Sequence, residues 1–188
     1  AMRPIVAAAD HILDLHSTSQ DVEPFWVYPQ HDRNTRVACA LPAPAVHLVM
    51  PQGLGSGTPV IQHGRHGQAQ SDAGAALVAE CGQHFKQRSA DLAIEVTLDF
   101  LGYFGLIERQ RRPAAAARRF ELLKTHVVAD PSFRFTRPVV GFETFAQGEL
   151  IAMDGDQPIH APCDQCTLFM PTREPIVGRE GVYLTRPL

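Results

Sequence analysis

The chain has 188 residues, with 17 Lys and Arg against 20 Asp and Glu, and a formal net charge of -3. Hydrophobic residues make up 45% of it and charged residues 20%, which is a globular composition and excludes wholesale disorder. The acidic balance argues against a general nucleic-acid binder, and no apolar run approaches the roughly 18 residues of a membrane helix. Four cysteines in a chain of this length do not form a disulfide scaffold, so we expect a cytoplasmic, reduced protein.

The first part of the chain, residues 1–110, alternates apolar runs with helical patterns and predicts an α/β domain. A helix is expected over 86–107, where apolar residues recur at the spacing of one helix face, and a weaker one over 31–41. The near-continuous apolar runs suit strands of a sheet that is covered on both faces. These predicted strands are 9–16, 46–50 and 75–81.

Charged residues on and after the long helix predict solvent-exposed surface. Asp91, Glu95 and Asp99 follow one another at i,i+4 on the side opposite the apolar face, which favours a solvated face over a site. The segment 108–119 then holds five arginines in twelve residues. Since no aromatic residue interleaves with these arginines, we expect an exposed linker at 111–119 rather than a phosphate-binding patch.

The last part, residues 118–188, has no helical period, and short β-type runs alternate with turns. Several short strands at this spacing predict a small all-β domain, either a barrel or a sandwich. Within it, Cys163-Asp-Gln-Cys166 is a single Cys-x-x-Cys motif that precedes a strand. A zinc ribbon requires a second pair and a thioredoxin-type site requires a following helix, so we interpret the motif as a hairpin turn. The predicted strands are 120–123, 125–128, 149–152, 166–170 and 181–184.

Two ionisable residues lie where apolar strands are predicted to end, which is where sites form in α/β sheets. His16 follows Leu13-Asp-Leu15, and a neutral imidazole in that position is a good zinc ligand; the alternative is a histidine bonded to its own loop. Glu80 ends another apolar run. Burial there raises the pKa of a carboxylate, which suits a general base, whereas the alternative is a glutamate satisfied by a helix N-terminus or an arginine.

The motifs occur in a defined order along the chain. Leu13-Asp-Leu-His-Ser-Thr18 precedes Leu77-Val-Ala-Glu-Cys-Gly-Gln-His84, and a helix and a β region follow. Their order and spacing resemble the succinylglutamate desuccinylase/aspartoacylase family, from about residue 5 to the end of the chain. The closing segments that share this likeness are Gly148-Glu-Leu-Ile-Ala152, Ala161-Pro-Cys-Asp164, Met170-Pro-Thr172 and Val177-Gly-Arg-Glu180.

The resemblance implies a zinc-dependent hydrolase of N-acyl amino acids or related amides. Its fold would be a partial zinc-carboxypeptidase-like α/β domain at 1–110 and a barrel-sandwich-like β domain at 118–188. His16 would correspond to the later of the family's zinc ligands, and Glu80 to its general base. Zinc lowers the pKa of bound water toward ~7 and polarises the scissile carbonyl. The carboxylate then carries the water's proton to the leaving amine.

One family motif is absent from the sequence. The family also binds zinc through a His-x-x-Glu pair upstream of the Leu-Asp-Leu-His strand, and no histidine of this chain has a glutamate three residues later. His11 and Asp14 are no substitute, because positions i and i+3 point to opposite faces of a strand. The chain thus resembles the carboxyl-terminal portion of a family enzyme. We expect it to bind zinc weakly or not at all and to be inactive alone; the alternative is a non-catalytic binding or assembly module derived from that family.

Two further features carry expectations. His63, His66 and His84 are the only other concentration of histidines, and they predict either a surface loop or a replacement metal site. The strand from His11 to Leu15 lacks upstream neighbours. Because an exposed strand edge pairs with other chains, we expect a homo-oligomer, most simply a two-fold dimer that buries this strand.

Overall fold

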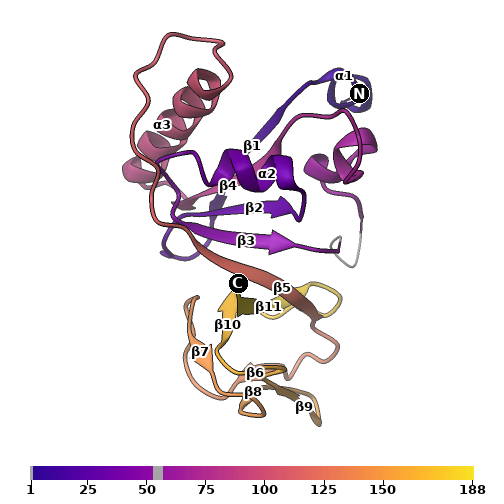
Figure 1. The fold of residues 1–188 in the computed structure, drawn as a ribbon. Coiled ribbons are helices and arrows are strands. Elements are labelled where there is room, and N and C mark those ends of the chain that lie inside the picture. Colours follow the sequence, from indigo (N-terminus) through magenta and orange to yellow (C-terminus); the bar gives the residue numbers. More distant parts are fainter. Residues whose placement is uncertain (1, 53–56) are drawn as a thin grey trace. The chain divides into compact units, whose positions relative to one another are not determined.

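The computed structural model describes residues 2–52 and 57–188. The chain divides into two compact units, Ala1–Arg119 and Phe120–Leu188, and the division falls inside one strand, β5 (Arg118–Val127) (Figure 1). Among the described residues, no helix is both long enough and apolar enough to cross a membrane.

The first unit contains a mixed sheet in the order β1-β4-β2-β3. Strands β1 and β4 run parallel, β2 lies antiparallel to β4, and β3 runs parallel to β2. Among the described residues, β1 therefore pairs with one strand, β4, and lies at the edge of the sheet. The elements of this unit are α1 (Arg3–Ala8), β1 (Ile12–Thr18), β2 (Phe25–Pro29), α2 (Asp32–Ala38), β3 (Val46–Met50), the 3-10 turns η1 (Val60–Gln62) and η2 (Gly64–Gly67), β4 (Ala76–Gln83) and α3 (Gln87–Tyr103).

The core of the first unit lies between the sheet and two helices. Apolar side chains of β2 and β4 pack against α2 and α3, and Trp26 and Leu77 are fully buried among them. Every second residue of β4 points into this core, so Leu77 and Ala79 lie on the helix side. Val78 and Glu80 consequently lie on the opposite face of β4.

Strand β2 was not expected from the sequence, although it occupies the centre of the sheet. Its five residues follow Pro24 and end with Pro29, which makes the segment look like a loop. It is nonetheless fully buried at Trp26 and Tyr28. The expectation that all predicted strands are covered on both faces is wrong for β1, because Leu15 is 43% exposed at the sheet edge.

The acidic residues of α3 are not all solvated as the sequence suggested. Asp99 is buried, and its Oδ1 accepts a hydrogen bond from Arg109 Nε over 2.6 Å. Arg112 also binds Asp99, and Arg109 reaches Glu95 over 2.7 Å. The arginine-rich segment after α3 is thus held back against the helix, so the prediction of a solvated face is wrong for Asp99.

The second unit is built of antiparallel strands around its own apolar core. Two strand sets are present, ordered β5-β11-β10-β7 and β6-β8-β9. The predicted runs 120–123 and 125–128 form the single strand β5. The other strands are β6 (Arg134–Phe135), β7 (Thr144–Phe145), β8 (Leu150–Asp154), β9 (Gln157–His160), β10 (Cys166–Phe169) and β11 (Glu180–Pro187).

Candidate functional site

The two residues singled out from the sequence lie side by side in the sheet. Strands β1 and β4 are parallel, and their register places His16 opposite Glu80. Directly paired residues of neighbouring strands project from the same face, so both side chains leave the sheet together. Asp14 lies two residues before His16 on β1 and shares that face. The two strands thereby gather three ionisable groups at one sheet edge.

His16 lies between two carboxylates. Its Nδ1 is 3.5 Å from Glu80 Oε1, and its Nε2 is 3.2 Å from Asp14 Oδ1. The side chain of Glu80 is 7% exposed, whereas those of His16 and Asp14 are 49% and 31% exposed. The imidazole therefore connects a buried carboxylate to one that solvent reaches.

Glu80 is the most perturbed group of this cluster. Burial raises the pKa of its carboxyl, the nearby charge of Asp14 raises it further, and the interaction with His16 opposes both. Its Oε2 is buried and has no hydrogen-bond partner among the described residues. A buried carboxylate with a raised pKa and a free oxygen is suited to take up a proton.

The described residues do not by themselves fit a zinc ion. Zinc sites in proteins use three or four nitrogen, sulfur or oxygen ligands. Within 2–52 and 57–188, no group of three or more His, Cys, Asp or Glu side chains is arranged to hold a metal. Each nitrogen of His16 instead faces a carboxylate oxygen, so the imidazole makes ionic contacts on both sides.

The remaining histidines and the paired cysteines do not join this cluster. His66 is fully buried in η2, and its Nε2 contacts the carbonyl oxygen of Ala9 over 3.0 Å. His84 Nδ1 lies 2.7 Å from Ser17 Oγ. Cys163 and Cys166 are free thiols at a turn between β9 and β10. Those strands belong to different strand sets, so the prediction of a turn is confirmed but that of a hairpin is wrong.

Sequence reasoning overlooked two parts of this edge. The first is Asp14, although the spacing Asp14-x-His16 places both on one face of a strand. The second is a hollow of about 420 Å³ beside His16. It lies between the end of β1 and the start of α3, and Ser17, Phe85 and Lys86 contribute to its lining. No sequence motif marks this hollow, because two segments that are far apart in the sequence, 15–17 and 81–93, form it.

No protein-family model and no curated protein matches the sequence. Solved structures do match the fold. The succinylglutamate desuccinylase of Vibrio cholerae superposes with a TM-score of 0.72 at 18% identity, over 99% of this chain and 57% of that one. A succinylglutamate desuccinylase/aspartoacylase of Rhodobacter sphaeroides gives 0.64 at 19% identity, over 98% and 60%. The product-bound ectoine utilization protein EutE (DoeB) of Ruegeria pomeroyi gives 0.63 at 15% identity, over 100% and 60%.

Sequence identity below 20% leaves the fold as the shared property. The α/β part of the expected fold is confirmed, since the chain, which contains a mixed sheet, superposes on these proteins along almost its whole length. The separate barrel-sandwich-like β domain at 118–188 stays a prediction. The chain spans a little over half the length of each of them. It therefore has the fold of the corresponding part of solved succinylglutamate desuccinylases and aspartoacylases.

Proposed function

We propose that the β1–β4 edge carries the proton-transfer residues of a hydrolytic site for N-acyl amino acids or related amides. The observation that supports this most directly is Glu80, a buried carboxylate with a raised pKa and one oxygen without a partner. It lies beside His16 near the carboxyl ends of two parallel strands. The same fold occurs in proteins described as succinylglutamate desuccinylase and aspartoacylase.

In this proposal Glu80 is the general base. Its free Oε2 accepts a proton from the attacking water, the oxygen of which forms a bond to the amide carbonyl carbon. When the C–N bond breaks, the same carboxyl returns the proton to the departing amine. His16 contacts Oε1 and keeps Oε2 directed toward the water. Burial assists both transfers, because it brings the pKa of the carboxyl closer to the working pH.

The family that this chain resembles binds zinc, and His16 would be one of the zinc ligands. The described residues do not complete a zinc site. The proposed proton transfer therefore involves only residues of this chain. We propose that this chain supplies one ligand and the base. On its own it is then inactive, since a single imidazole does not hold catalytic zinc.

The second candidate function is a non-catalytic binding or assembly module. It is favoured by the exposure of an apolar side chain on β1, where Leu15 is 43% exposed. In such a module His16 and Glu80 would be retained from a catalytic ancestor without a present role. The two candidates differ in one measurable respect, which is whether Glu80 supports turnover when a complete site surrounds it.

A chimera separates them. Residues 1–188 replace the matching part of the Vibrio cholerae protein, and hydrolysis of N-succinylglutamate is followed as release of succinate. We expect turnover that falls at least ~100-fold in the Glu80→Gln version, the size of effect typical for a general base. Glu108→Gln, an exposed glutamate of the same unit, is the matched control. A folded chimera without turnover, or one indifferent to Glu80→Gln, would favour the module.

A further inference from the structure

Two of the four cysteines lie three residues apart in the second unit. Cys163 begins the turn between β9 and β10, and Cys166 ends it as the first residue of β10. The chain reverses there through Gln165, which has a left-handed backbone with φ of 51°. A β-turn brings the Cα atoms of its first and last residues within about 7 Å, which is close to the range of ~4.4–6.8 Å that a disulfide spans.

The two thiol groups contact each other and the same backbone position. Cys163 Sγ donates a hydrogen bond to the carbonyl oxygen of Thr185 over 3.9 Å, and the thiol of Cys166 is bonded to the backbone of that residue. A side-chain hydrogen bond joins the two thiols. Cys163 also packs against the apolar cluster to which Cys166 belongs. Only a small movement therefore separates this dithiol from a disulfide.

The two thiols differ in how they meet a reagent. Cys163 is partly exposed, whereas Cys166 is fully buried. Burial, aided by the charge of Cys163, raises the pKa of the Cys166 thiol to about 11. Because the thiolate is the attacking form, Cys166 reacts poorly with a reagent in solution. It still reaches a sulfur atom that is held beside it, since no diffusional encounter is needed.

We propose that Cys163 and Cys166 form a dithiol that exchanges with small-molecule disulfides such as oxidised glutathione and closes into a reversible intrachain disulfide. The Cys163 thiolate attacks one sulfur of the small disulfide, whose S–S bond breaks, so that a mixed disulfide and one free thiol result. The Cys166 thiolate then attacks the Cys163 sulfur, and the second small thiol leaves. The two thiol protons pass to the two leaving thiolates. The dithiol thus loses two electrons, and the small disulfide gains them.

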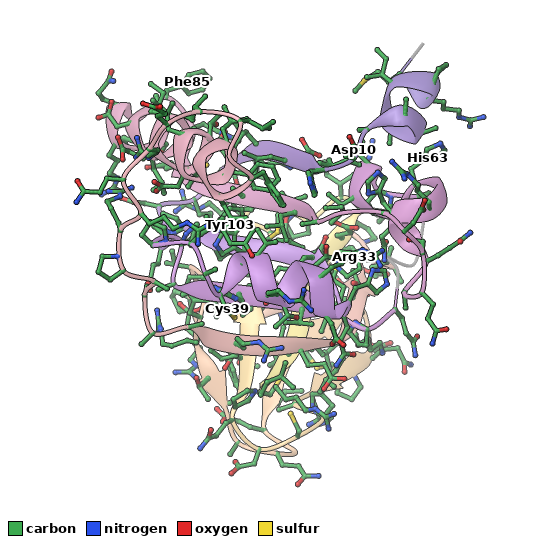
Figure 2. All side chains as sticks on the ribbon, turned by 45° about the horizontal axis from the view of Figure 1, so that its top comes forward. Asp10, Arg33, Cys39, His63, Phe85 and Tyr103 are labelled. Carbon is green, nitrogen blue, oxygen red and sulfur yellow. The ribbon has the colours of Figure 1, made fainter. Side chains whose placement is uncertain are left out.

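The other two cysteines serve as internal controls. Cys39 follows the last residue of α2 in the first unit (Figure 2) and is partly exposed, as Cys163 is. Cys81 is buried in β4, and its Sγ donates to the carbonyl oxygen of Ala79 over 3.4 Å. Exposure alone would make Cys39 and Cys163 equally reactive. A nearby second thiol distinguishes Cys163, and the inference does not depend on the proposed hydrolytic function.

Glutathione redox buffers test the proposal on the whole chain. After equilibration the remaining thiols are alkylated, and the chain is cleaved with trypsin for mass spectrometry. Cys163 and Cys166 fall together in the tryptic peptide 135–173, whereas Cys39 and Cys81 fall in two others, 37–65 and 66–86. We expect peptide 135–173 to resist alkylation and to be about 2 Da lighter, the mass of the two hydrogen atoms that oxidation removes. Cys39 should gain a glutathione at most.

Single substitutions separate the two roles. Cys166→Ala should stop at the mixed disulfide, so that peptide 135–173 gains one glutathione on Cys163. Cys163→Ala should leave Cys166 unmodified, because the folded chain keeps the buried thiol away from the reagent. Reduced glutathione in excess should restore both thiols of the wild type. The wild-type peptide map is informative even if a variant folds poorly.

A comparison of the folded and unfolded chain tests whether the fold presents the pair. The equilibrium constant for disulfide formation against glutathione should be at least ~10-fold higher in the native chain than in concentrated urea, since the turn holds the thiols together. Three results would overturn the proposal. They are a wild type that keeps both thiols or stops at the mixed disulfide in excess oxidised glutathione, a constant no higher than in urea, and glutathione on Cys166 of folded Cys163→Ala.

Discussion

The His126–Asp154 pair of the second unit and the His16–Glu80 pair of the first unit have opposite electrostatics. In the second unit, His126 Nε2 lies 2.8 Å from Asp154 Oδ2, and the two oxygens of Asp154 also accept the backbone N–H groups of Ala129 and Asp130. Although burial alone would raise the pKa of Asp154, these hydrogen bonds lower it below its ordinary value. In the first unit, burial raises the pKa of Glu80, and Oε2 has no partner among the described residues.

The difference shows what separates a structural carboxylate from a reactive one. Both side chains are almost completely buried, so burial does not distinguish them. The number of donors does. Asp154 accepts three hydrogen bonds and is stabilised in its charged form, whereas Glu80 has one imidazole neighbour and its pKa is raised. Four changes to the protein probe this comparison.

Removal of the Asp154 carboxylate should have the largest effect. Asp154→Ala leaves two backbone N–H groups and His126 without their acceptor, and each unsatisfied buried group costs about 1–3 kcal/mol. We expect the free energy of unfolding to fall by about 3 kcal/mol in urea denaturation. Asp156→Ala, at an exposed turn residue, is the control and should change it by less than about 0.5 kcal/mol.

The same pair predicts a response to acid. A carboxylate whose pKa is lowered by folding contributes stability above its unfolded pKa, near 3.9, and loses that contribution as the pH falls through the folded value. The stability gap between wild type and Asp154→Ala should therefore be widest near neutral pH and narrow below about pH 4. A gap that is constant from pH 7 to pH 3 would show that the charge of Asp154 is irrelevant.

Substitution of the two histidines should produce the next largest difference in stability between the two pairs. His126 is largely buried and stacks on Phe133 with ring centroids 5.6 Å apart, so His126→Ala should cost about 1.5 kcal/mol. His16 is half exposed, and His16→Ala should cost less than about 0.5 kcal/mol. Thermal unfolding of the two variants side by side measures the contrast. Equal losses would remove the structural distinction between the two imidazoles.

Neutralisation of Glu80 should act in the opposite direction. A group whose pKa is raised by folding favours the folded state below its unfolded pKa, and this contribution disappears as the pH rises through the folded value. Glu80→Gln stays neutral, so it should match the wild type near pH 4 and be more stable than the wild type at pH 8. Denaturant midpoints across this pH range are the measurement. A variant that is less stable than wild type at pH 8 would mean that the folded protein stabilises the charged form of the Glu80 carboxylate.

Local patterns were sufficient to predict much of this arrangement. The strand Val46–Met50 was predicted with its observed bounds, because an apolar run before Pro51 has few other solutions. His16 and Glu80 were predicted as site residues because each interrupts an apolar run near a strand end. Their register, which brings them within 3.5 Å, depends on the pairing of segments about 60 residues apart and is invisible to a local pattern.

Other features depend on long-range contacts that overrule local propensity. Strand β2 follows Pro24 and ends with Pro29, and it forms because its neighbours on both sides complete the backbone hydrogen bonding. Asp99 looked solvated from the helical pattern, since Arg109 and Arg112 reach it only after the chain turns back. Charge patterns along a single helix cannot reveal a partner contributed by the following segment.

Addition of zinc should have the smallest effect on stability. The described residues place one imidazole and no complete set of zinc ligands at the β1–β4 edge. A metal stabilises a fold by RT ln(1 + [L]/Kd), so weak binding through one histidine shifts the midpoint little. After a chelator wash, we expect well below ~0.3 zinc per chain by elemental analysis, and a thermal shift under ~1 °C with 100 µM zinc. His16→Ala should leave both values unchanged, and His63→Ala tests for adventitious binding in the histidine-containing loop. Stoichiometric zinc that is lost in His16→Ala but kept in His63→Ala would mean that further ligands converge on His16. Glu80 would then lie beside a metal centre, and its raised pKa would have to be explained together with the charge of the ion.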